Sequence, residues 1–581
     1  GVTFLHPEVE NLLVPADLPW PPAGAATGGV LRRSFEYGEP KGFNALLESS
    51  GILEDRIYTY CRLRLAERNG WTDPNTYYGT FAHRVEVTDD AKEFTAYLRR
   101  GVTWHPPAGV PLDDPKYAWL RGEHEVTARD LAFTLELVTH PRVRAGPWKS
   151  YYAGVESWKV LDDYTFVVRW KRNDYANRSA TLDLWPTPRF LYARDEDGTP
   201  FPEETLGARF NQHWYDNRGF VGAGPYRMTH YEPGSKIVLE RNERALGDKP
   251  PLQKLVYLIY SDAKTTLLKL RAGELDDGEL TPGQYREEIT DPEKAGERPA
   301  NSPFFDGRIR CEKVPRFAYS YVAWNAARPF FADKRVRRAL THALDRQRII
   351  DGVFGSLGTL ATGPFAADSP KNDPSVAPLA FDLARARALL DEAGFRDTNG
   401  DGLVDRELRP GDGARAPFEF RLSFAAGQKE AEATAKIFAD DLLKIGVRAL
   451  LEPQEWSLLQ KQKEERSFDA TMASRTTPWQ AELHPVWHSS QADVLHGANI
   501  VGFRNREADR IIEALRQTFD EAERVRLFRA FHRIVDDEQP YTFVMTRAKV
   551  HCAWRHVKHR VYAKITPVEN SLPWWSEEAR R

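Results

Sequence analysis

The residue types that could carry chemistry occur here in patterns that are mostly incomplete. Gly222-Ala-Gly224 has the glycine spacing of a phosphate-binding turn, but Pro225 follows and has no N–H to donate to a phosphate. His484 and His488 have the i, i+4 spacing of two zinc ligands, yet the intervening proline and the lack of an HExxH motif favour a structural role. No motif for nucleotide, hydrolase or metalloenzyme chemistry is therefore complete.

One short segment does have the chemistry of a metal site. Oxygen-bearing side chains stand at the first, third, fifth and ninth positions of a calcium-binding loop: Asp397, Asn399, Asp401 and Asp405. Gly402, at the sixth position, permits the sharp turn that such loops need. The twelfth position holds Leu408 instead of a bidentate glutamate. The segment predicts either a structural Ca²⁺ site or a polar turn between a helix and a strand, and no cofactor is required.

The composition excludes several classes of protein. A chain of 581 residues is long enough for several domains, and 41% hydrophobic with 12% aromatic residues is typical of a folded protein, not of a disordered one. Lys and Arg number 81 against 84 Asp and Glu, which gives a net charge of −3. Nucleic-acid binders carry a basic excess, so we expect no nucleic-acid partner.

Cysteine usage and hydropathy add two further limits. Cys61, Cys311 and Cys552 form no CxxC pair, which excludes a zinc ribbon or a thioredoxin motif. One disulfide is compatible with three cysteines, but their spacing leaves its pairing open. No run of 18 apolar residues occurs, so no transmembrane helix is expected. The sequence begins at Gly1 without a basic and apolar leader, which fits either a cytosolic protein or one whose signal has been removed.

Strands that alternate with helices must position these residues. Alternating polarity predicts strands at 94–98, 160–168 (a hairpin that turns at 162–163), 237–240, 255–260, 319–324, 418–424 and 449–452. A capping box at Thr127-Ala-Arg-Asp130 starts a helix that runs to 138. Helical periodicity predicts helices at 336–354, 383–393, 432–445, 508–518 and 521–536. Residues 1–29 predict an irregular arm and 281–309 a long connection, and the whole pattern indicates an α/β architecture.

Several segments follow one another in a characteristic order and spacing. They are LRRGVTWH at 98–105, VTARDLAF at 126–133, GAGPY at 222–226, WN followed by PFFADKRVRRAL and LDR within 324–346, FD to ALLDEAGF within 381–395, FDA at 468–470, and WHSS, NIVGF and N within 487–505. Each segment alone is a weak signal, but the set is specific. Over about residues 30–575 the chain resembles the extracellular solute-binding proteins of family 5, which include the oligopeptide- and dipeptide-binding components of ABC importers.

The resemblance implies a fold. Such proteins are α/β and similar to periplasmic binding proteins, with two lobes joined by a hinge and a β-rich subdomain inserted in lobe I. The predicted boundaries are 1–60, 181–317 and 547–581 for the three parts of lobe I, 61–180 for the inserted subdomain, and 318–546 for lobe II. Ligand is captured between the lobes of such proteins, which close on it.

The resemblance also implies a function, which is to bind and deliver a ligand, so we expect that the protein is not an enzyme and has no catalytic residues. We predict a monomeric protein, periplasmic or extracytoplasmic with its signal peptide removed, that passes a small peptide to the membrane permease of an ABC transporter. One alternative keeps the fold but binds an oligosaccharide, a metal chelate or an acidic metabolite. A second is an enzyme that acts in the cleft, for which no motif was found. A third is a receptor that binds solute and docks on a membrane sensor.

The segment that binds the ligand's ammonium group in the family departs from the family pattern here. It runs from 468 to 482, and Ser474-Arg475 replaces its usual Gly-Trp. The usual aspartate is missing, and Glu482 is the nearest acid. We predict that Glu482 binds the ammonium group, unless it is a solvated surface acid. Arg475 is predicted to clamp a carboxylate or phosphate, unless it forms an ordinary salt bridge.

The remaining predicted ligand-binding residues come from the resemblance by position. Tyr151, Tyr152 and Trp456 resemble aromatic residues of the pocket wall, with the protein core as the alternative. Thr476 and Trp479 belong to the segment just described, and Ser50 falls in a lobe I loop that touches ligand in the family. The predicted ligand-binding set is therefore Ser50, Tyr151, Tyr152, Trp456, Ser474, Arg475, Thr476, Trp479 and Glu482.

Overall fold

The structure is a computed structural model, and the chain divides into two units. The structure describes residues 2–3, 18–35, 39–48, 50–260, 262–291, 301–407, 411, 413–477, 479, 481–494, 497–565 and 568–577. Unit 1 comprises residues 1–280, 295–312 and 551–581, and unit 2 comprises residues 281–294 and 313–550. The predicted lobe II range, 318–546, lies inside unit 2. Residues 281–294, predicted as part of lobe I, belong instead to unit 2.

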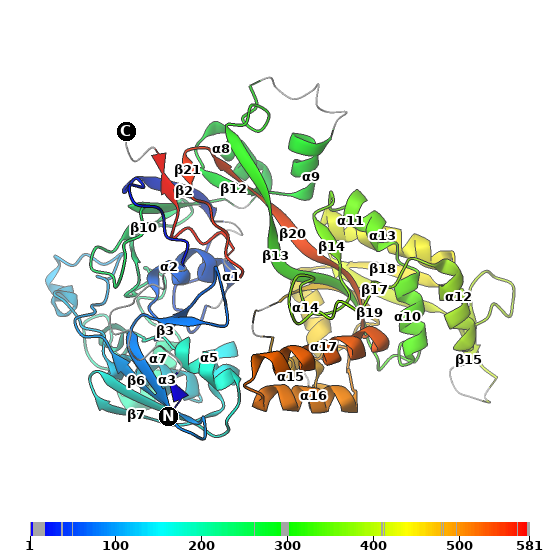
Figure 1. The fold of residues 1–581 in the computed structure, drawn as a ribbon, viewed down its shortest axis with the longest axis horizontal. Coiled ribbons are helices and arrows are strands. Elements are labelled where there is room, and N and C mark those ends of the chain that lie inside the picture. Colours follow the sequence, from blue (N-terminus) through cyan, green and yellow to red (C-terminus); the bar gives the residue numbers. More distant parts are fainter. Residues whose placement is uncertain are drawn as a thin grey trace. The chain divides into compact units, whose positions relative to one another are not determined.

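Unit 1 is rich in strands (Figure 1). Its strands are β1 (Val2–Thr3), β2 (Val30–Phe35), β3 (Ala66–Arg68), β4 (Tyr77–Gly79), β5 (Ala82–Val87), β6 (Glu93–Leu98), β7 (Val155–Asp162), β8 (Thr165–Trp170), β9 (Tyr226–Glu232), β10 (Lys236–Arg241), β11 (Lys254–Ile259), β12 (Asp277–Leu280), β21 (Val557–Lys558) and β22 (Trp575–Ser576). Its helices are α1 (Gly51–Leu53), the π-helix η1 (Glu54–Tyr58), α2 (Thr59–Cys61), the 3₁₀-helix η2 (Pro115–Leu120), α3 (Ala128–Thr139), α4 (Pro147–Tyr152), α5 (Ala176–Leu182), α6 (Arg189–Tyr192), α7 (Glu203–Phe210) and α8 (Ala263–Ala272).

Two sheets organise unit 1. The first has the antiparallel order β1-β5-β6-β8-β7, and the second has the order β2-β11-β10-β9, in which β2 and β11 are parallel. Apolar residues alternate along β6, and those at 94, 96 and 98 face the core that α3 also covers. Thr127 and Asp130 form the predicted capping box at the start of α3. The predicted irregular arm is wrong at 2–3, because backbone pairing joins β1 to β5.

Unit 2 combines helices with a mixed sheet. Its helices are α9 (Pro282–Tyr285), the π-helix η3 (Arg286–Thr290), α10 (Lys334–His342), α11 (Arg346–Gly352), α12 (Leu383–Glu392), α13 (Lys429–Leu443), α14 (Trp456–Glu465), α15 (His484–Trp487), the 3₁₀-helix η5 (Ser489–Gln491), α16 (Arg506–Gln517) and α17 (Glu521–Glu538). Its strands are β14 (Gly358–Leu360), β15 (Asp405–Glu407), β16 (Arg415–Pro417), β17 (Glu419–Ala425), β18 (Arg448–Gln454) and β19 (Ala470–Thr476).

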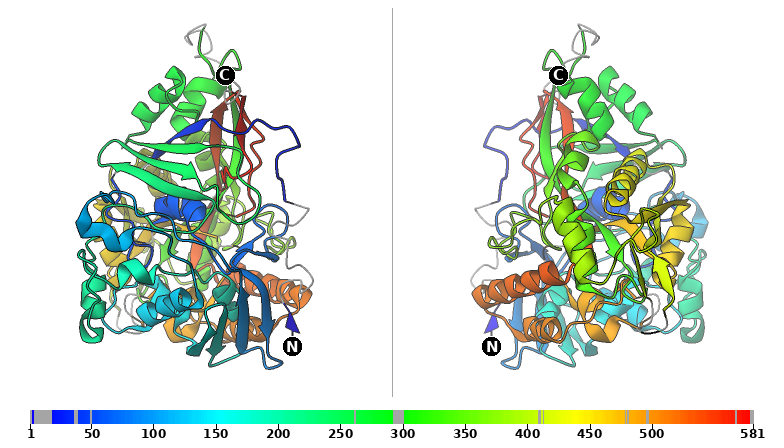
Figure 2. Two further views of the ribbon diagram at one scale, coloured as in Figure 1. Left: turned by 90° about the vertical axis from the view of Figure 1, so that its left-hand side faces the viewer. Right: turned by 90° about the vertical axis from the view of Figure 1, so that its right-hand side faces the viewer.

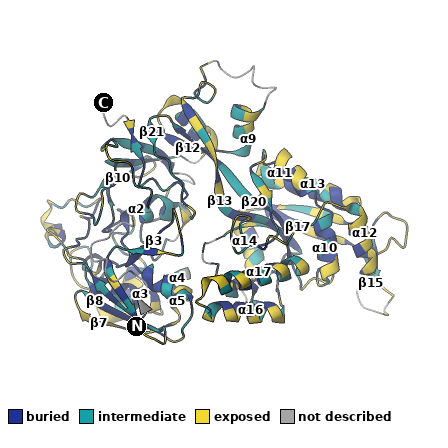
Figure 3. Ribbon diagram, in the orientation of Figure 1, coloured by how far each residue is buried: buried dark blue, intermediate teal, exposed yellow. Residues whose placement is uncertain are grey.

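The sheet of unit 2 places parallel strands at one edge. β18 and β19 both pair in parallel with β17. Helix α13 connects β17 to β18, and helix α14 connects β18 to β19. The helices bury one face and expose the other (Figure 3). The single helix predicted at 336–354 is wrong, because the backbone of Asp345 leaves the helical region. Its carboxylate then accepts the backbone N–H of Arg348 at 3.0 Å and starts a second helix, α11.

Two long strands are shared between the units. β13 (Ile309–Trp324) and β20 (Tyr541–Trp554) are neighbours in a sheet, and each has residues in both units (Figures 1 and 2). In the part of each strand that belongs to unit 1, Cys311 and Cys552 form a disulfide, which settles the pairing that the sequence left open. Cys61 is a buried free thiol.

The predicted long connection at 281–309 is partly structured. Its first turn is a helix, α9, with a capping box formed by Thr281 and Gln284. Residues 292–300 of this connection lie outside the described residues. Within the described part of the chain, no helix is long and apolar enough to cross a membrane.

Candidate functional site

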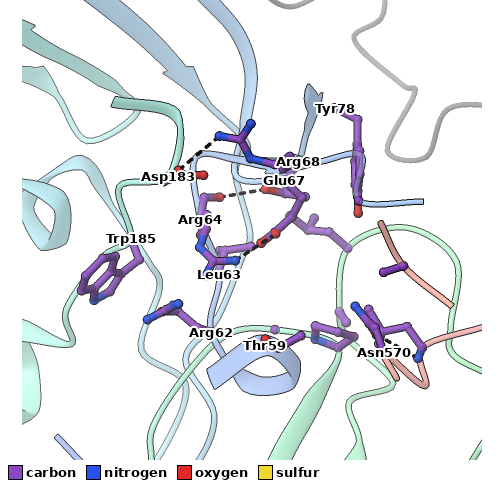
Figure 4. Close-up of a pocket in the computed structure, with 18 of the residues that line it drawn as sticks. Thr59, Arg62, Leu63, Arg64, Glu67, Arg68, Tyr78, Asp183, Trp185 and Asn570 are labelled. Carbon is purple, nitrogen blue, oxygen red and sulfur yellow. Dashed lines mark hydrogen bonds and ion pairs between the residues drawn. The ribbon is translucent and has the colours of Figure 1, made fainter. Parts of the chain in front are cut away.

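Unit 1 contains a cavity of about 410 Å³ that several distant segments enclose (Figure 4). We call it the unit 1 pocket. It is lined by the chain from η1 to β4, by α4, by the residues after α5, by the turn at 223–225, and by the C-terminal segment at 563–572. The chain enters the pocket at Arg62, where the backbone turns from helical to extended at the end of α2.

The glycine turn found in the sequence has a packing role here. A Cβ on Gly222 would lie 1.9 Å from the carbonyl oxygen of Cys61, so only glycine fits there. The N–H of Gly224 donates to the same oxygen at 2.9 Å. The turn therefore holds the backbone that carries Arg62 into the pocket, and no phosphate is needed to explain it.

Four charged side chains form one ion-pair network in the pocket. The Arg62 guanidinium contacts the Glu54 carboxylate, and Arg64 bridges Glu54 at 2.8 Å and Glu67 at 3.1 Å. Burial acts to raise the pKa of Glu54, but the two arginines outweigh it and lower that pKa below its ordinary value. Burial raises the pKa of Glu67 despite its pairing with Arg64. The network orders one wall of the pocket.

A fifth charged group, Asp183, stands apart from this network. Its carboxylate is 29% exposed, and the nearest guanidinium, that of Arg68, lies 3.8 Å away. Burial raises the pKa of Asp183, and Arg68, Arg64 and Arg62 do not offset this effect. The carboxylate has therefore lost hydration without gaining a close partner.

Aromatic rings form the facing wall. Trp148 packs edge-on against both Trp185 and Tyr151, with ring centroids 4.7 and 6.1 Å apart. The Arg62 guanidinium lies over the Trp185 ring at 4.6 Å. Tyr151 is 41% exposed and lines the pocket, as a wall residue would. Such a cavity can bind a group that is partly apolar and partly charged.

Two other predicted residues of unit 1 lie elsewhere. Tyr152 is buried in the core, where its hydroxyl donates to the carbonyl oxygen of Ala180 at 3.2 Å. The structure therefore gives Tyr152 the core position that was its alternative. Ser50 precedes α1 as an exposed residue and is not among the residues that line the unit 1 pocket.

In unit 2, the predicted segment forms strand β19. Ser474 and Thr476 are exposed on it, while Arg475 is half-buried and pairs with Tyr319 of β13. Burial acts to lower the pKa of Arg475, but the nearby tyrosines, led by Tyr541 and then Tyr321, raise it above its ordinary value. Its Nη2 donates to the carbonyl oxygen of Ala498 at 3.4 Å. The guanidinium is thus set into a tyrosine cluster rather than into a salt bridge.

The three remaining predicted residues of unit 2 contact different neighbours. Trp456 begins α14, is 61% exposed and has Lys463 Nζ 5.4 Å from its ring centre. Trp479 is contacted by Lys371, whose Nζ donates to its carbonyl oxygen and lies 5.6 Å from its ring centre. Glu482 is exposed and accepts the backbone N–H of His484 at 3.3 Å.

The loop at 397–405 is held by its own hydrogen bonds. Asp397 accepts the N–H groups of Gly400 and Gly402, at 2.7 and 3.0 Å. Asp401 accepts the N–H of Leu403 at 2.8 Å and Nδ2 of Asn399 at 3.1 Å.

The last predicted calcium ligand, Asp405, is turned towards other protein groups. It accepts from Thr398 and forms an ion pair with Arg415. Among the described residues, no group of three or more His, Cys, Asp or Glu side chains is arranged to hold a metal ion. Leu408, at the twelfth position, lies outside the described residues, and calcium binding stays a prediction.

Sequence reasoning missed most of the residues that line the unit 1 pocket. The missed charged and aromatic residues are Trp20, Glu54, Arg62, Arg64, Glu67, Arg68, Trp71, Tyr78, Trp148, Asp183, Trp185 and Asp248. One signal was present, because the run RLRLAER at 62–68 alternates charged and apolar residues as a half-buried strand does. The contribution of Asp183 and Trp185 had no local signal, since the chain brings them in from far along the sequence.

Comparison with known proteins gives a consistent result. The family model described as "Bacterial extracellular solute-binding proteins, family 5 Middle" matches residues 65–491. The oligopeptide-binding protein AppA of Bacillus subtilis is 25% identical over 519 residues, which cover 87% of this chain and 84% of that protein.

Solved structures show the same fold. The structure of Bacillus subtilis AppA in complex with a nonapeptide matches with a TM-score of 0.72 at 23% identity, over 95% of this chain and 99% of that one. NikA of Brucella suis in complex with Fe(III)-EDTA matches with a TM-score of 0.74 at 18% identity, over 94% of this chain and 100% of that one. The predicted α/β fold, similar to that of periplasmic binding proteins, is confirmed.

Proposed function

Because the chain belongs to family 5 of the bacterial extracellular solute-binding proteins, we propose that it captures a peptide and delivers it to the membrane permease of an ABC importer. The observation that carries the proposal is the family match over residues 65–491, together with the likeness to an oligopeptide-binding protein along 87% of the chain. The work consists of binding and release, so we assign no catalytic residue. We place the protein in the periplasm or otherwise outside the cytoplasm, and we expect it to act as a monomer.

The unit 1 pocket supports a ligand of this kind. Its volume of about 410 Å³ is in the range of small-ligand sites, which are mostly apolar with a few polar groups. Tyr151 and Trp185 offer ring faces to apolar atoms, and Asp183 offers a carboxylate. In unit 2, the exposed Ser474 and Thr476 and the adjacent Arg475 remain our proposed contacts on β19.

The test is to identify what the protein carries when it is purified. Heat denaturation of the fresh protein, followed by mass spectrometry of the released small molecules, is expected to give a set of short peptides. An extract of the same buffer is the control. A single sugar, metal chelate or acidic metabolite would contradict the peptide proposal and leave the family and fold intact.

A variant tests whether the unit 1 pocket takes part. Tyr151→Ala is expected to weaken binding of the released peptides about tenfold in calorimetric titration, because an exposed ring loses its contact with ligand. Phe381→Ala is the matched control, since Phe381 is exposed but does not line the pocket. Equal affinities of the two variants would exclude the pocket from the binding site.

A further inference from the structure

We propose that the Asp183 carboxylate receives a cationic nitrogen of the ligand, an ammonium or a guanidinium, in the unit 1 pocket. This inference rests on the proposed function, because it names the part of the peptide that the pocket takes.

The first argument is that Asp183 differs from Glu54 and Glu67, two other acids that line the unit 1 pocket. Glu54 and Glu67 each accept hydrogen bonds from arginines. The Asp183 carboxylate accepts no hydrogen bond from the described residues, and its one ion pair, with Arg68, spans 3.8 Å. Charged donors stabilise a half-buried carboxylate, so this one has room for another partner.

The second argument is that Arg68 is held away from Asp183. Its Nη1 donates to the carbonyl oxygen of Pro74 at 2.6 Å, and its Nη2 donates to the hydroxyl of Tyr77. Its guanidinium also lies over the Tyr77 ring at 4.6 Å. Figure 4 marks the ion pair between Arg68 and Asp183, which spans 3.8 Å. Closing this distance would strain the contacts of Arg68 with Pro74 and Tyr77.

The third argument is that the backbone fixes the carboxylate at the pocket. Asp183 ends α5, and its N–H donates to the carbonyl oxygen of Ser179 at 2.8 Å. The next residue, Leu184, accepts the N–H of Leu65 at 2.9 Å, which ties this turn to the segment at 62–68 that carries the arginines. The side chain is therefore presented to the cavity by a rigid segment, which favours a preorganised contact.

The fourth argument is the charge and the chemistry of the walls. Among the described residues that line the pocket, three arginines face four acids, Asp248 being the fourth, so one negative charge is left over. The rings of Tyr151, Trp148 and Trp185 line the same pocket, and aromatic rings attract cations. Burial raises the pKa of Asp183, and a bound cation would return the stabilisation that its charged form has lost.

The experiment is a calorimetric titration of four peptides into the wild type and Asp183→Asn. The peptides are Ala-Ala-Ala, its N-acetylated form, N-acetyl-Ala-Lys-Ala and N-acetyl-Ala-norleucine-Ala. The wild type is expected to bind at least one cation-bearing peptide about tenfold more tightly than its counterpart without the cationic nitrogen. Asp183→Asn is expected to abolish that preference and to leave the affinity for the peptides without a cationic nitrogen unchanged.

The arms of the experiment distinguish the source of the cation. A preference lost on acetylation assigns an α-ammonium, and a preference for lysine over norleucine assigns a basic side chain. Asp183→Glu keeps the charge and is expected to keep part of the preference, while Asp113→Asn removes an exposed acid that does not line the pocket and is expected to change nothing. Melting temperatures of all variants show that they are folded.

Two failures have different meanings. The first is that Asp183→Asn loses affinity equally for peptides with and without a cationic nitrogen, or that the wild type shows no preference between them. Either result would overturn this inference and leave peptide binding in place. Failure of all four peptides, and of any peptide released from the purified protein, to bind the wild type would overturn the proposed function and this inference with it.

Discussion

At the scale of single residues, the pKa values of the charged groups of unit 1 depend on burial and on their partners in different ways. Arg62 keeps 3% of its side chain exposed, its Nε and Nη1 have no hydrogen-bond partner, and burial lowers its pKa. The charge of Arg62 is stabilised by its ion pair with Glu54 and by the Trp185 ring, over which the guanidinium lies. None of this could be predicted from the sequence, because the partners of Arg62 come from different segments.

A buried histidine allows a prediction about pH. His105 is fully enclosed next to the 222–224 turn, where its backbone N–H donates to Gly222 and its Nε2 donates to the carbonyl oxygen of Gly224 at 3.1 Å. Burial lowers the pKa of His105 to about 4. An unfolded imidazole takes up its proton near a pKa of about 6.5, so acidification from pH 6.5 to 4 protonates the unfolded state first. The free energy of unfolding should fall through this window, by up to about 3 kcal/mol from this residue.

The measurement compares urea unfolding of the wild type and His105→Gln at pH 7 and pH 5. Glutamine can donate the same hydrogen bond but does not titrate, so the variant should lose less stability on acidification than the wild type. His230→Gln is the control, because His230 is exposed. Parallel losses in the wild type and both variants would show that His105 does not contribute to the pH dependence.

At the scale of elements, local signals were reliable where one segment determines its own structure. The Thr127 capping box, the hairpin of β7 and β8, and the amphipathic helices α12, α13, α16 and α17 were all predicted close to their observed bounds. Two predictions were wrong because a distant strand or a single polar side chain determined the local structure. β1 forms because β5 is available to pair with it, and Asp345 caps a new helix where the apolar pattern alone continues.

The loop at 397–405 gives a prediction about calcium. Its carboxylates already accept N–H groups of the loop, and Arg415 places a positive charge next to Asp405. Because a cation there would compete with these donors, we expect the polar-turn alternative to hold. Millimolar CaCl₂ should shift the melting temperatures of the wild type and Asp401→Ala equally, and no more than MgCl₂ does. A calcium-specific rise that Asp401→Ala removes would establish the metal site.

At the scale of the whole molecule, the chain builds two units with separate cores and shares two strands between them. The family resemblance predicted a lobe II over 318–546, and this range lies inside unit 2. The assignment of 281–294 to unit 2 could not be predicted, because it depends on packing that has no local pattern. The pairing of Cys311 with Cys552 likewise depends on β13 and β20 lying side by side, which spacing alone does not reveal.

The disulfide predicts a loss of stability when it is removed. It joins residues 241 positions apart, and cross-links that close long loops restrict the unfolded chain most. Cys552→Ala is expected to lower the free energy of unfolding by about 2–4 kcal/mol in urea. The double variant with Cys311→Ala should lose little more, and reduction of the wild type should have a similar effect. Full additivity of the two substitutions would show that each cysteine acts through its own packing instead.

The same pair of cysteines lies next to the two points where the larger part of unit 2 is inserted in the unit 1 sequence. Their Cα atoms lie 4.0 Å apart, so the chain leaves unit 1 after residue 312 and re-enters it at residue 551 at two neighbouring points. Residues 313–550 are therefore one continuous insertion, and the two ends of unit 1 that flank it lie close together. Replacing this segment with the matching segment of a related protein would leave both ends where they are.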